Sequence, residues 1–98
     1  MAAGQAGRRN RLPQFDWDEH NEDKLLDRHG VSAWEAEQCF GNPNTRRRTG
    51  DDLVMLGKTD DGRMLLLIYE QKANGAVRVF SAREMTEKER HIYRRNAR

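Results

Sequence analysis

The sequence predicts an α/β protein of the α+β kind, with an antiparallel sheet of about four strands, two N-terminal helices packed on one face of the sheet, and a C-terminal helix. Three observations predict this class. Helix-start and helix-stop signals fill residues 18–41, short alternating segments with turn signals between them fill residues 45–83, and a capping box opens a last helix at Thr86. The 98 residues suffice for one small domain and exclude a second.

The first helix is expected to begin at Asp18 and Glu19, because negative charge in a first turn is favoured by the helix dipole. It should end at about His29, since Gly30 follows at the position where a left-handed residue ends many helices. Two interpretations of His29 stay open: it caps this helix through the last carbonyls, or it takes part in catalysis.

The second helix is expected to begin at Ser32, which has capping-box spacing to Glu35, and to stop before Pro43, which cannot continue a helix. A chain this small needs its aromatic rings inside. The rings expected in the core are those of Phe15, Trp17, Trp34 and Phe40. The single Cys39 cannot form an internal disulfide, and its neighbour Phe40 indicates a buried thiol.

The strands are expected over residues 45–49, 53–59, 63–71 and 76–83, with turns at 50–51, 60–62 and 74–75. If residues 74 and 75 form a two-residue turn, Tyr69 lies opposite Phe80; if Lys58 lies opposite Arg63, then Leu56 faces Leu65. One face would then be mixed, and it would hold Lys58, Arg63, Tyr69, Arg78 and Phe80 around Val54, Leu56, Leu65 and Leu67. The other face, which the two helices would cover, would hold Leu53, Met55, Met64, Leu66, Ile68, Val77 and Val79.

The formal net charge of +2 hides an uneven distribution. Residues 14–40 carry eight acidic and two basic side chains, whereas residues 1–13 and 41–83 are both basic in balance. This asymmetry predicts an acidic helical layer behind a basic sheet layer that faces a polyanion, although two ordinary solvated faces would give the same count. Residues 1–13 are expected to be a disordered basic leader, and residues 14–98 a single domain. No apolar run is long enough to cross a bilayer, so a cytoplasmic protein without membrane contact is expected.

Four blocks of the sequence resemble a known family, the BrnT toxins, which are RelE-like ribonuclease toxins of bacterial type II toxin-antitoxin pairs. These blocks are FDWDEHN, RHGVSAWEAEQCF, LGKTDDGRMLLLIYE and RVFSAREMTEKERHIYRR, and the last of them is the most specific. The resemblance implies a RelE-like domain that cleaves RNA and inhibits translation. It also implies neutralisation by a cognate antitoxin that resembles the BrnA family and binds DNA.

Some positions of the family motifs are matched in this chain, namely His29, Arg63, Arg78, Arg83, Glu89, Arg90 and Tyr93. Others depart from the family: many relatives have Lys where this chain has Asn21 and Asn where it has Leu25. The run from Arg46 to Arg48 is individual to this chain.

The chemistry expected from these residues is cleavage of RNA without a metal ion, in which the ribose 2′-hydroxyl attacks the neighbouring phosphate. Arg63 and Arg83, with Lys58 in support, would stabilise the growing negative charge, because a guanidinium can bind two phosphoryl oxygens at once. Proton transfer would fall to His29, or to the phenol of Tyr69 or Tyr93. The side chains expected to bind RNA are Arg78, Tyr69, Arg46, Arg48, Arg90 and Tyr93. No cofactor is expected, and no metal site, since three histidines stand without carboxylates at ligand spacing.

Each assignment has a structural alternative. Arg83 would pair with Glu84 or Glu89 instead of a phosphate, and Arg63 with the aspartates that precede it. Glu89, Arg90 and Tyr93 would serve capping and packing.

The partners expected are RNA and the antitoxin, which should cover the basic sheet face or its rim with acidic segments. A dimer of toxin–antitoxin heterodimers is one assembly that this allows. Two functions from other classes stay open: a noncatalytic nucleic-acid-binding module, and a subunit that only binds the antitoxin within a transcriptional repressor complex.

Overall fold

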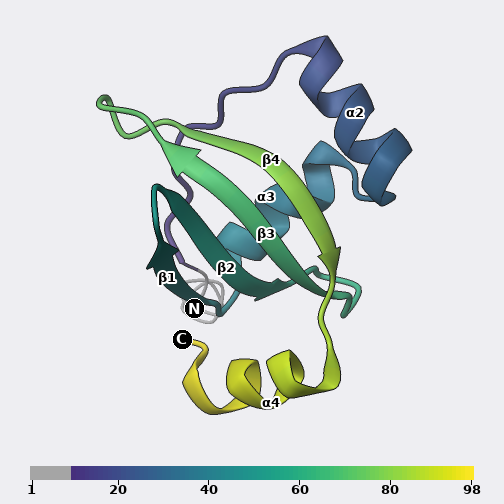
Figure 1. Cartoon of the computed structure of the whole chain (residues 1–98), viewed down its shortest axis with the longest axis vertical. Coiled ribbons are helices and arrows are strands. Elements are labelled where there is room, and N and C mark those ends of the chain that lie inside the picture. Colours follow the sequence, from purple (N-terminus) through teal and green to yellow (C-terminus); the bar gives the residue numbers. More distant parts are fainter. Residues whose placement is uncertain (1–9) are drawn as a thin grey trace, which may run out of the picture.

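The structure is a computed structural model that describes residues 10–98. The elements are α2 (Glu19–His29), α3 (Ala33–Gly41), β1 (Thr45–Thr49), β2 (Asp52–Lys58), β3 (Met64–Gln71), β4 (Val77–Glu84) and α4 (Glu87–Asn96). The strands form one antiparallel sheet in the order β1-β2-β3-β4, with α3 behind it and α4 across one end (Figure 1). The predicted α+β fold is therefore confirmed. None of the helices in residues 10–98 is long and apolar enough to span a membrane.

The helix ends follow local sequence signals. Asp18 is the N-cap of α2 and accepts a hydrogen bond from the backbone N–H of Asn21 at 2.8 Å. Gly30 ends the helix with φ of 66°, and its N–H donates to the carbonyl of Leu26. Both predicted capping boxes are formed, at Ser32 with Glu35 and at Thr86 with Glu89.

The predicted strand register is wrong by one residue in both long hairpins. The N–H of Thr59 donates to the carbonyl of Arg63, and the N–H of Lys72 donates to that of Ala76, so each connection is a three-residue loop. Each loop ends in a glycine with positive φ, 94° at Gly62 and 90° at Gly75, which is the usual form of a three-residue hairpin. Side chains alternate between the two faces of a strand. A register shift of one residue therefore places the apolar side chains of β3 on the face opposite to the predicted one.

The core has two parts, one on each face of the sheet. The larger part lies under α2, which packs over β4, and α3, which packs over β2. Its buried side chains are Leu25, Val31, Ala36, Cys39, Phe40, Met55, Leu65, Leu67, Tyr69, Val77, Val79 and Ala82. The smaller part, on the side of α4, consists of Leu56, Leu66, Met85 and Tyr93, with Val54, Met64 and Ile68 packed against it. We call the second face the α4-side face.

The aromatic residues bear out the core prediction only in part. Phe40 is fully buried and makes edge contacts with Phe15 and Tyr69 at 5.1 Å between ring centroids, while Trp17 packs partly against this cluster. Trp34 was expected inside, but its side chain is 67% exposed. The reason is its position in the first turn of α3, since the helix buries the opposite stripe.

Of the predicted leader, residues 1–9 lie outside the described residues. Asn10 departs from the prediction of disorder, because its backbone N–H donates to the carbonyl of Gly41 at 2.7 Å. Its side chain also donates to the carbonyls of Asn42 and Arg98, at 3.1 and 3.0 Å.

Candidate functional site

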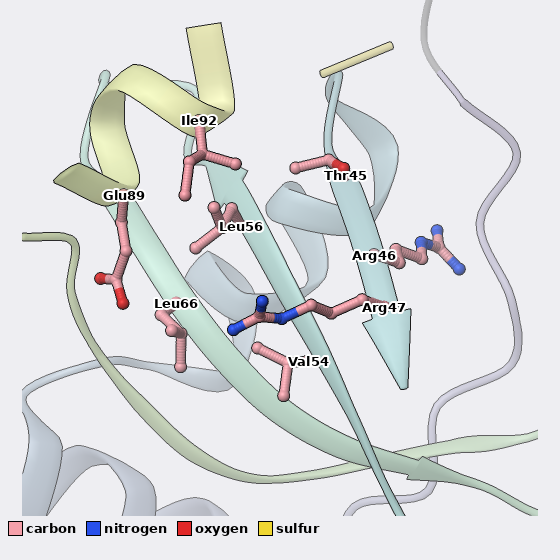
Figure 2. A pocket seen from close by; sticks show the side chains of 8 residues that line it. All are labelled: Thr45, Arg46, Arg47, Val54, Leu56, Leu66, Glu89 and Ile92. Carbon is pink, nitrogen blue, oxygen red and sulfur yellow. The ribbon is translucent and has the colours of Figure 1, made fainter. Parts of the chain in front are cut away.

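The α4-side face carries a groove between the sheet and α4, with a volume of about 70 Å³ (Figure 2). The residues that line it are Thr45, Arg46, Arg47, Val54, Leu56, Leu66, Glu89 and Ile92. The aliphatic side chains form its floor, and α4 contributes one acidic and one apolar side chain. The groove is therefore a half-covered apolar surface with charged groups at its sides.

Arg47 is the basic side chain that points into this groove. It lies opposite Val54 in the register of β1 and β2, and its guanidinium extends across the sheet toward Leu66 (Figure 2). The residue is exposed, and its guanidinium has no carboxylate partner among residues 10–98. The prediction named its neighbours Arg46 and Arg48 and omitted Arg47. Strand alternation was the signal that could have found it, because side chains two apart share a face and the middle one points the other way.

Arg83 and Glu89 form a two-pronged ion pair beside the groove. Both terminal nitrogens of Arg83 donate to the two carboxylate oxygens of Glu89, each at 2.8 Å. The hydrogen bond from Arg83 is the largest cause that lowers the pKa of Glu89, to about 2, with the cap hydrogen bond from the Thr86 N–H adding to it. Glu89, which lines the groove, is thus ionised at neutral pH and holds the guanidinium of Arg83.

Arg63 lies at the same end of the sheet but on the α3 side. Its guanidinium donates to Glu35 at 2.9 Å, to Glu84 at 2.7 and 3.1 Å, and to the carbonyl of Gly30 at 3.1 Å. These hydrogen bonds raise the pKa of Arg63. Its partners are glutamates distant in sequence, and not the adjacent aspartates.

The expected common pocket of Arg63 and Arg83 is therefore not formed. Glu84 separates the two: its carboxylate accepts from Arg63, while its backbone carbonyl accepts from Arg83 at 3.1 Å. Arg63 contacts α3 through Glu35, whereas Arg83 contacts α4 through Glu89, and these helices cover opposite faces. The physical reason is that successive strand residues such as 83 and 84 point to opposite faces.

The other two residues expected to be catalytic also lie on different sides. His29 is the last residue of α2, is half-buried, and precedes the glycine whose carbonyl binds Arg63. Lys58 is exposed at the end of β2, opposite Met64, and therefore lies on the α4-side face. It borders a separate shallow depression that also includes Tyr93.

Tyr69 and Tyr93 are both buried, so their rings are not accessible to RNA. Tyr69 was expected on the mixed face, but the register shift turns it into the larger core, where it is 2% exposed. Burial raises its pKa. Tyr93 is 7% exposed, and its hydroxyl donates to the carbonyl of Pro43 at 2.9 Å.

The remaining cationic candidates mostly bind other groups of the chain. Arg78 donates to Asp16 and Asp18 at 3.4 and 2.8 Å, and Arg90 donates to the carbonyl of Met85 at 2.9 Å. Arg46 donates to Asn44 and lies 5.1 Å from the ring centroid of Phe40. Arg48 lines another depression, with Asp51 and Glu70.

Within residues 10–98, no three His, Cys, Asp or Glu side chains lie close enough together to hold a metal ion.

Residues 17–89 match the sequence model of a family described as the ribonuclease toxin BrnT of type II toxin-antitoxin systems. The matched span runs from the residue before the N-cap of α2 to the first turn of α4, so it includes the whole sheet together with Arg47, Arg83 and Glu89. No curated protein matches the chain.

Proposed function

The chain belongs to the BrnT family, the ribonuclease toxins of type II toxin-antitoxin systems, and from this premise we propose that it cleaves RNA in the groove of the α4-side face. The reaction that we propose is attack by a ribose 2′-hydroxyl on the adjacent phosphate, without a metal ion. It leaves a 2′,3′-cyclic phosphate on one fragment, while the 5′ oxygen of the other fragment takes up a proton and departs as a hydroxyl.

The observation that carries this proposal is a groove that has one guanidinium pointing into it and a second guanidinium bound to a carboxylate of its lining. Arg47 points into the groove without a carboxylate partner among the described residues, while Arg83 is bound to Glu89, which lines the groove. A phosphate has enough oxygens to bind both groups, and a guanidinium binds phosphate oxygens in pairs. The aliphatic floor around Val54 excludes water on one side and so strengthens these interactions.

We assign to Glu89 the part of general base. While Arg83 is bound to it, its pKa of about 2 makes it a weak base. A phosphate that recruits Arg83 removes the largest cause of that lowering, so the pKa of Glu89 rises toward its ordinary value as substrate binds. The same exchange therefore supplies a cation to the phosphate and a more basic carboxylate to the 2′-hydroxyl.

The other expected residues take supporting parts in this proposal. Lys58, exposed on the same face, would attract the RNA strand. Arg63 and His29 lie on the α3 side, where Arg63 ties Glu35 to Glu84, and we assign them to the stability of this end of the domain. Arg46, Arg48, Arg78 and Arg90 would add to the positive field that draws RNA to the domain.

We further propose that a cognate antitoxin neutralises the toxin by covering this groove with acidic side chains, and that cleavage of RNA in the cytoplasm inhibits translation. Arg47 supports the idea, because an exposed guanidinium without an internal carboxylate partner is attractive to a partner's carboxylate as well as to a phosphate.

The test uses two adjacent arginines that point to opposite faces. Purified full-length protein is incubated with a labelled single-stranded RNA, and with the same RNA carrying 2′-deoxyribose throughout. Arg47→Ala should lower kcat/KM about 10- to 100-fold, whereas the matched control Arg48→Ala should change it less than about 3-fold. The 2′-deoxy strand should not be cut. Equal losses in the two variants, or cleavage of the 2′-deoxy strand, would contradict the proposal.

A noncatalytic binding subunit is the second candidate. The observation that favours it is that Arg63, Arg78 and Arg83 are all bound to carboxylates of the chain itself. Such a subunit would bind RNA or its antitoxin but would give no cleavage product and no growth arrest when produced without the antitoxin.

A further inference from the structure

The sheet contains an irregularity that brings an aromatic ring to the α4-side face. Ile68 lies opposite Ser81, whereas Tyr69 lies opposite Val79, so Phe80 is an extra residue in β4. The buried residues Val79 and Ala82, which face the larger core, are consequently three positions apart instead of two. Both residues between them, Phe80 and Ser81, therefore point to the opposite face.

The bulge is held in place from the other side. The side-chain amide of Asn21, on α2, donates to the carbonyl of Val79 at 3.1 Å, directly before the extra residue. Asn21 is itself only 7% exposed, so this contact is shielded from water. A bulge fixed in this way sets the direction of Phe80 before any ligand arrives.

Phe80 is one of the few large apolar side chains that remain exposed in the described part of the chain, at 38%. On the same face it has partly buried Ile68 on one side and Arg83, three residues further along the strand, on the other. Arg83 is one of the two guanidinium groups that the proposed function assigns to phosphate binding. An exposed ring with a guanidinium group further along the same strand and face fits a single-stranded nucleic acid, which offers flat bases and phosphates together.

We propose that Phe80 stacks on an unpaired base of the RNA and so forms a base-binding subsite next to the cleavage groove. The inference rests on the proposed function, because it takes the RNA strand to lie across the α4-side face. Ser81, presented by the same bulge, offers a hydroxyl to an edge of that base or to its ribose. Stacking accepts every base, so the subsite positions the strand more than it reads the sequence.

The experiment measures binding of the full-length protein to a 12-nucleotide RNA that carries 2′-O-methyl groups and cannot be cut by 2′-hydroxyl attack. Single abasic sites are moved along this strand, and in a second series the fluorescent base 2-aminopurine takes their place. The variants are Phe80→Leu, which keeps an apolar side chain, and Phe80→Tyr, which keeps the ring. The control variant is Trp34→Leu, since that ring is 67% exposed but lies on the helical layer.

At one position, loss of the base should weaken binding by the wild type about 10-fold, and 2-aminopurine there should be quenched. Phe80→Leu should bind the intact strand about 10-fold more weakly, with no further loss at the abasic position and no quenching. Phe80→Tyr and Trp34→Leu should bind like the wild type. Circular dichroism of each variant tests folding, and the quenching in the wild type and in Phe80→Tyr remains a test even if Phe80→Leu unfolds.

Two failures are distinguishable. If Arg47→Ala weakens binding but Phe80→Leu does not, or if the abasic penalty is the same in both proteins, the stacking subsite is overturned while the groove remains. If Arg47→Ala leaves binding unchanged, or if the wild type does not bind the strand, the proposed RNA face is wrong and the subsite with it. Quenching that Trp34→Leu abolishes would overturn the subsite by placing the base on the helical layer.

Discussion

Glu89 has two structural roles, because its carboxylate caps α4 and also forms the ion pair with Arg83. The substitution Glu89→Gln separates these two roles. Glutamine is nearly the same size and can still accept the N–H of Thr86, so the capping box of α4 is kept. The negative charge is lost, and with it the ion pair to Arg83 that now has both nitrogen–oxygen distances at 2.8 Å. We expect lower stability, a changed dependence of stability on pH, and slower cleavage.

The magnitude follows from the pKa of Glu89. Its lowering from 4.5 to about 2 corresponds to at most about 3 kcal/mol of folding free energy. The side chain of Arg83 is 50% exposed, and solvent screening at such a site reduces the stabilisation to about 1 kcal/mol. Because the folded-state pKa is the lower one, this contribution is complete above about pH 5 and is lost as pH falls through the folded-state value.

Urea unfolding of both proteins at a series of pH values measures this contribution. The wild type should exceed Glu89→Gln by about 1 kcal/mol near pH 7, by less than half of that near pH 3, and by almost nothing near pH 2. Other carboxylates titrate in both proteins, so the difference isolates residue 89. A difference that stays constant from neutral pH to pH 2 would show that the ion pair is not its cause.

Cleavage and binding should respond in opposite directions in the same variant. Glu89→Gln should lower kcat about 100-fold, because the base is gone, and should bind an uncleavable RNA as tightly as the wild type or more tightly, because Arg83 is released to the phosphate. If kcat is unchanged, Glu89 is not the base. If binding weakens, the exchange of Arg83 from carboxylate to phosphate is refuted.

Three further substitutions or reactions test the packing. Gly57→Ala should cost about 1–3 kcal/mol in urea unfolding, because its new Cβ would lie 2.8 Å from the Cβ of Cys39; unchanged stability would mean that α3 moves away without cost. The Cys39 thiol, whose pKa burial raises to about 12, should react with a disulfide reagent about 100-fold more slowly in the folded protein than in urea, and equal rates would contradict its burial. Arg63→Ala should lower the free energy of unfolding by about 1–2 kcal/mol near neutral pH, because Glu35 and Glu84 lose the cation that they share. The loss should be smaller in acid, where Glu35 becomes protonated and its lowered pKa no longer contributes to stability. A loss of cleavage with full stability would instead assign Arg63 to the reaction.

Local signals in the sequence predicted the elements of this fold well. The caps at Ser32 and Thr86, and the glycine after α2, act within a few residues of chain, so their hydrogen bonds can be read without knowledge of the rest. The strand segments were equally readable, because alternation of apolar side chains is a property of each strand alone. The pairing of those strands was not, since a two-residue and a three-residue loop both accept a glycine such as Gly75.

The candidate site depended on that pairing. A change of one loop residue in each hairpin, from two to three residues between β3 and β4 and from four to three between β2 and β3, turned Tyr69 into the core. One extra residue in β4 brought Phe80 and Ser81 to the α4-side face. Alternation along β1 could have separated Arg47 from its neighbours, but only the sheet determined which face lies open.

The sequence by itself determined that this is a small α+β domain, where its helices begin and end, and its family resemblance, because these features rest on residues close together in the chain. Only the tertiary structure decided which carboxylate each arginine binds. Arg63, Arg83 and Arg47 are similar cations in the sequence, yet one ties two glutamates, one is held by a capping glutamate, and one is left pointing into a groove. The physical reason is that an ion pair depends on the distance between groups in space, and strand register and helix packing set that distance.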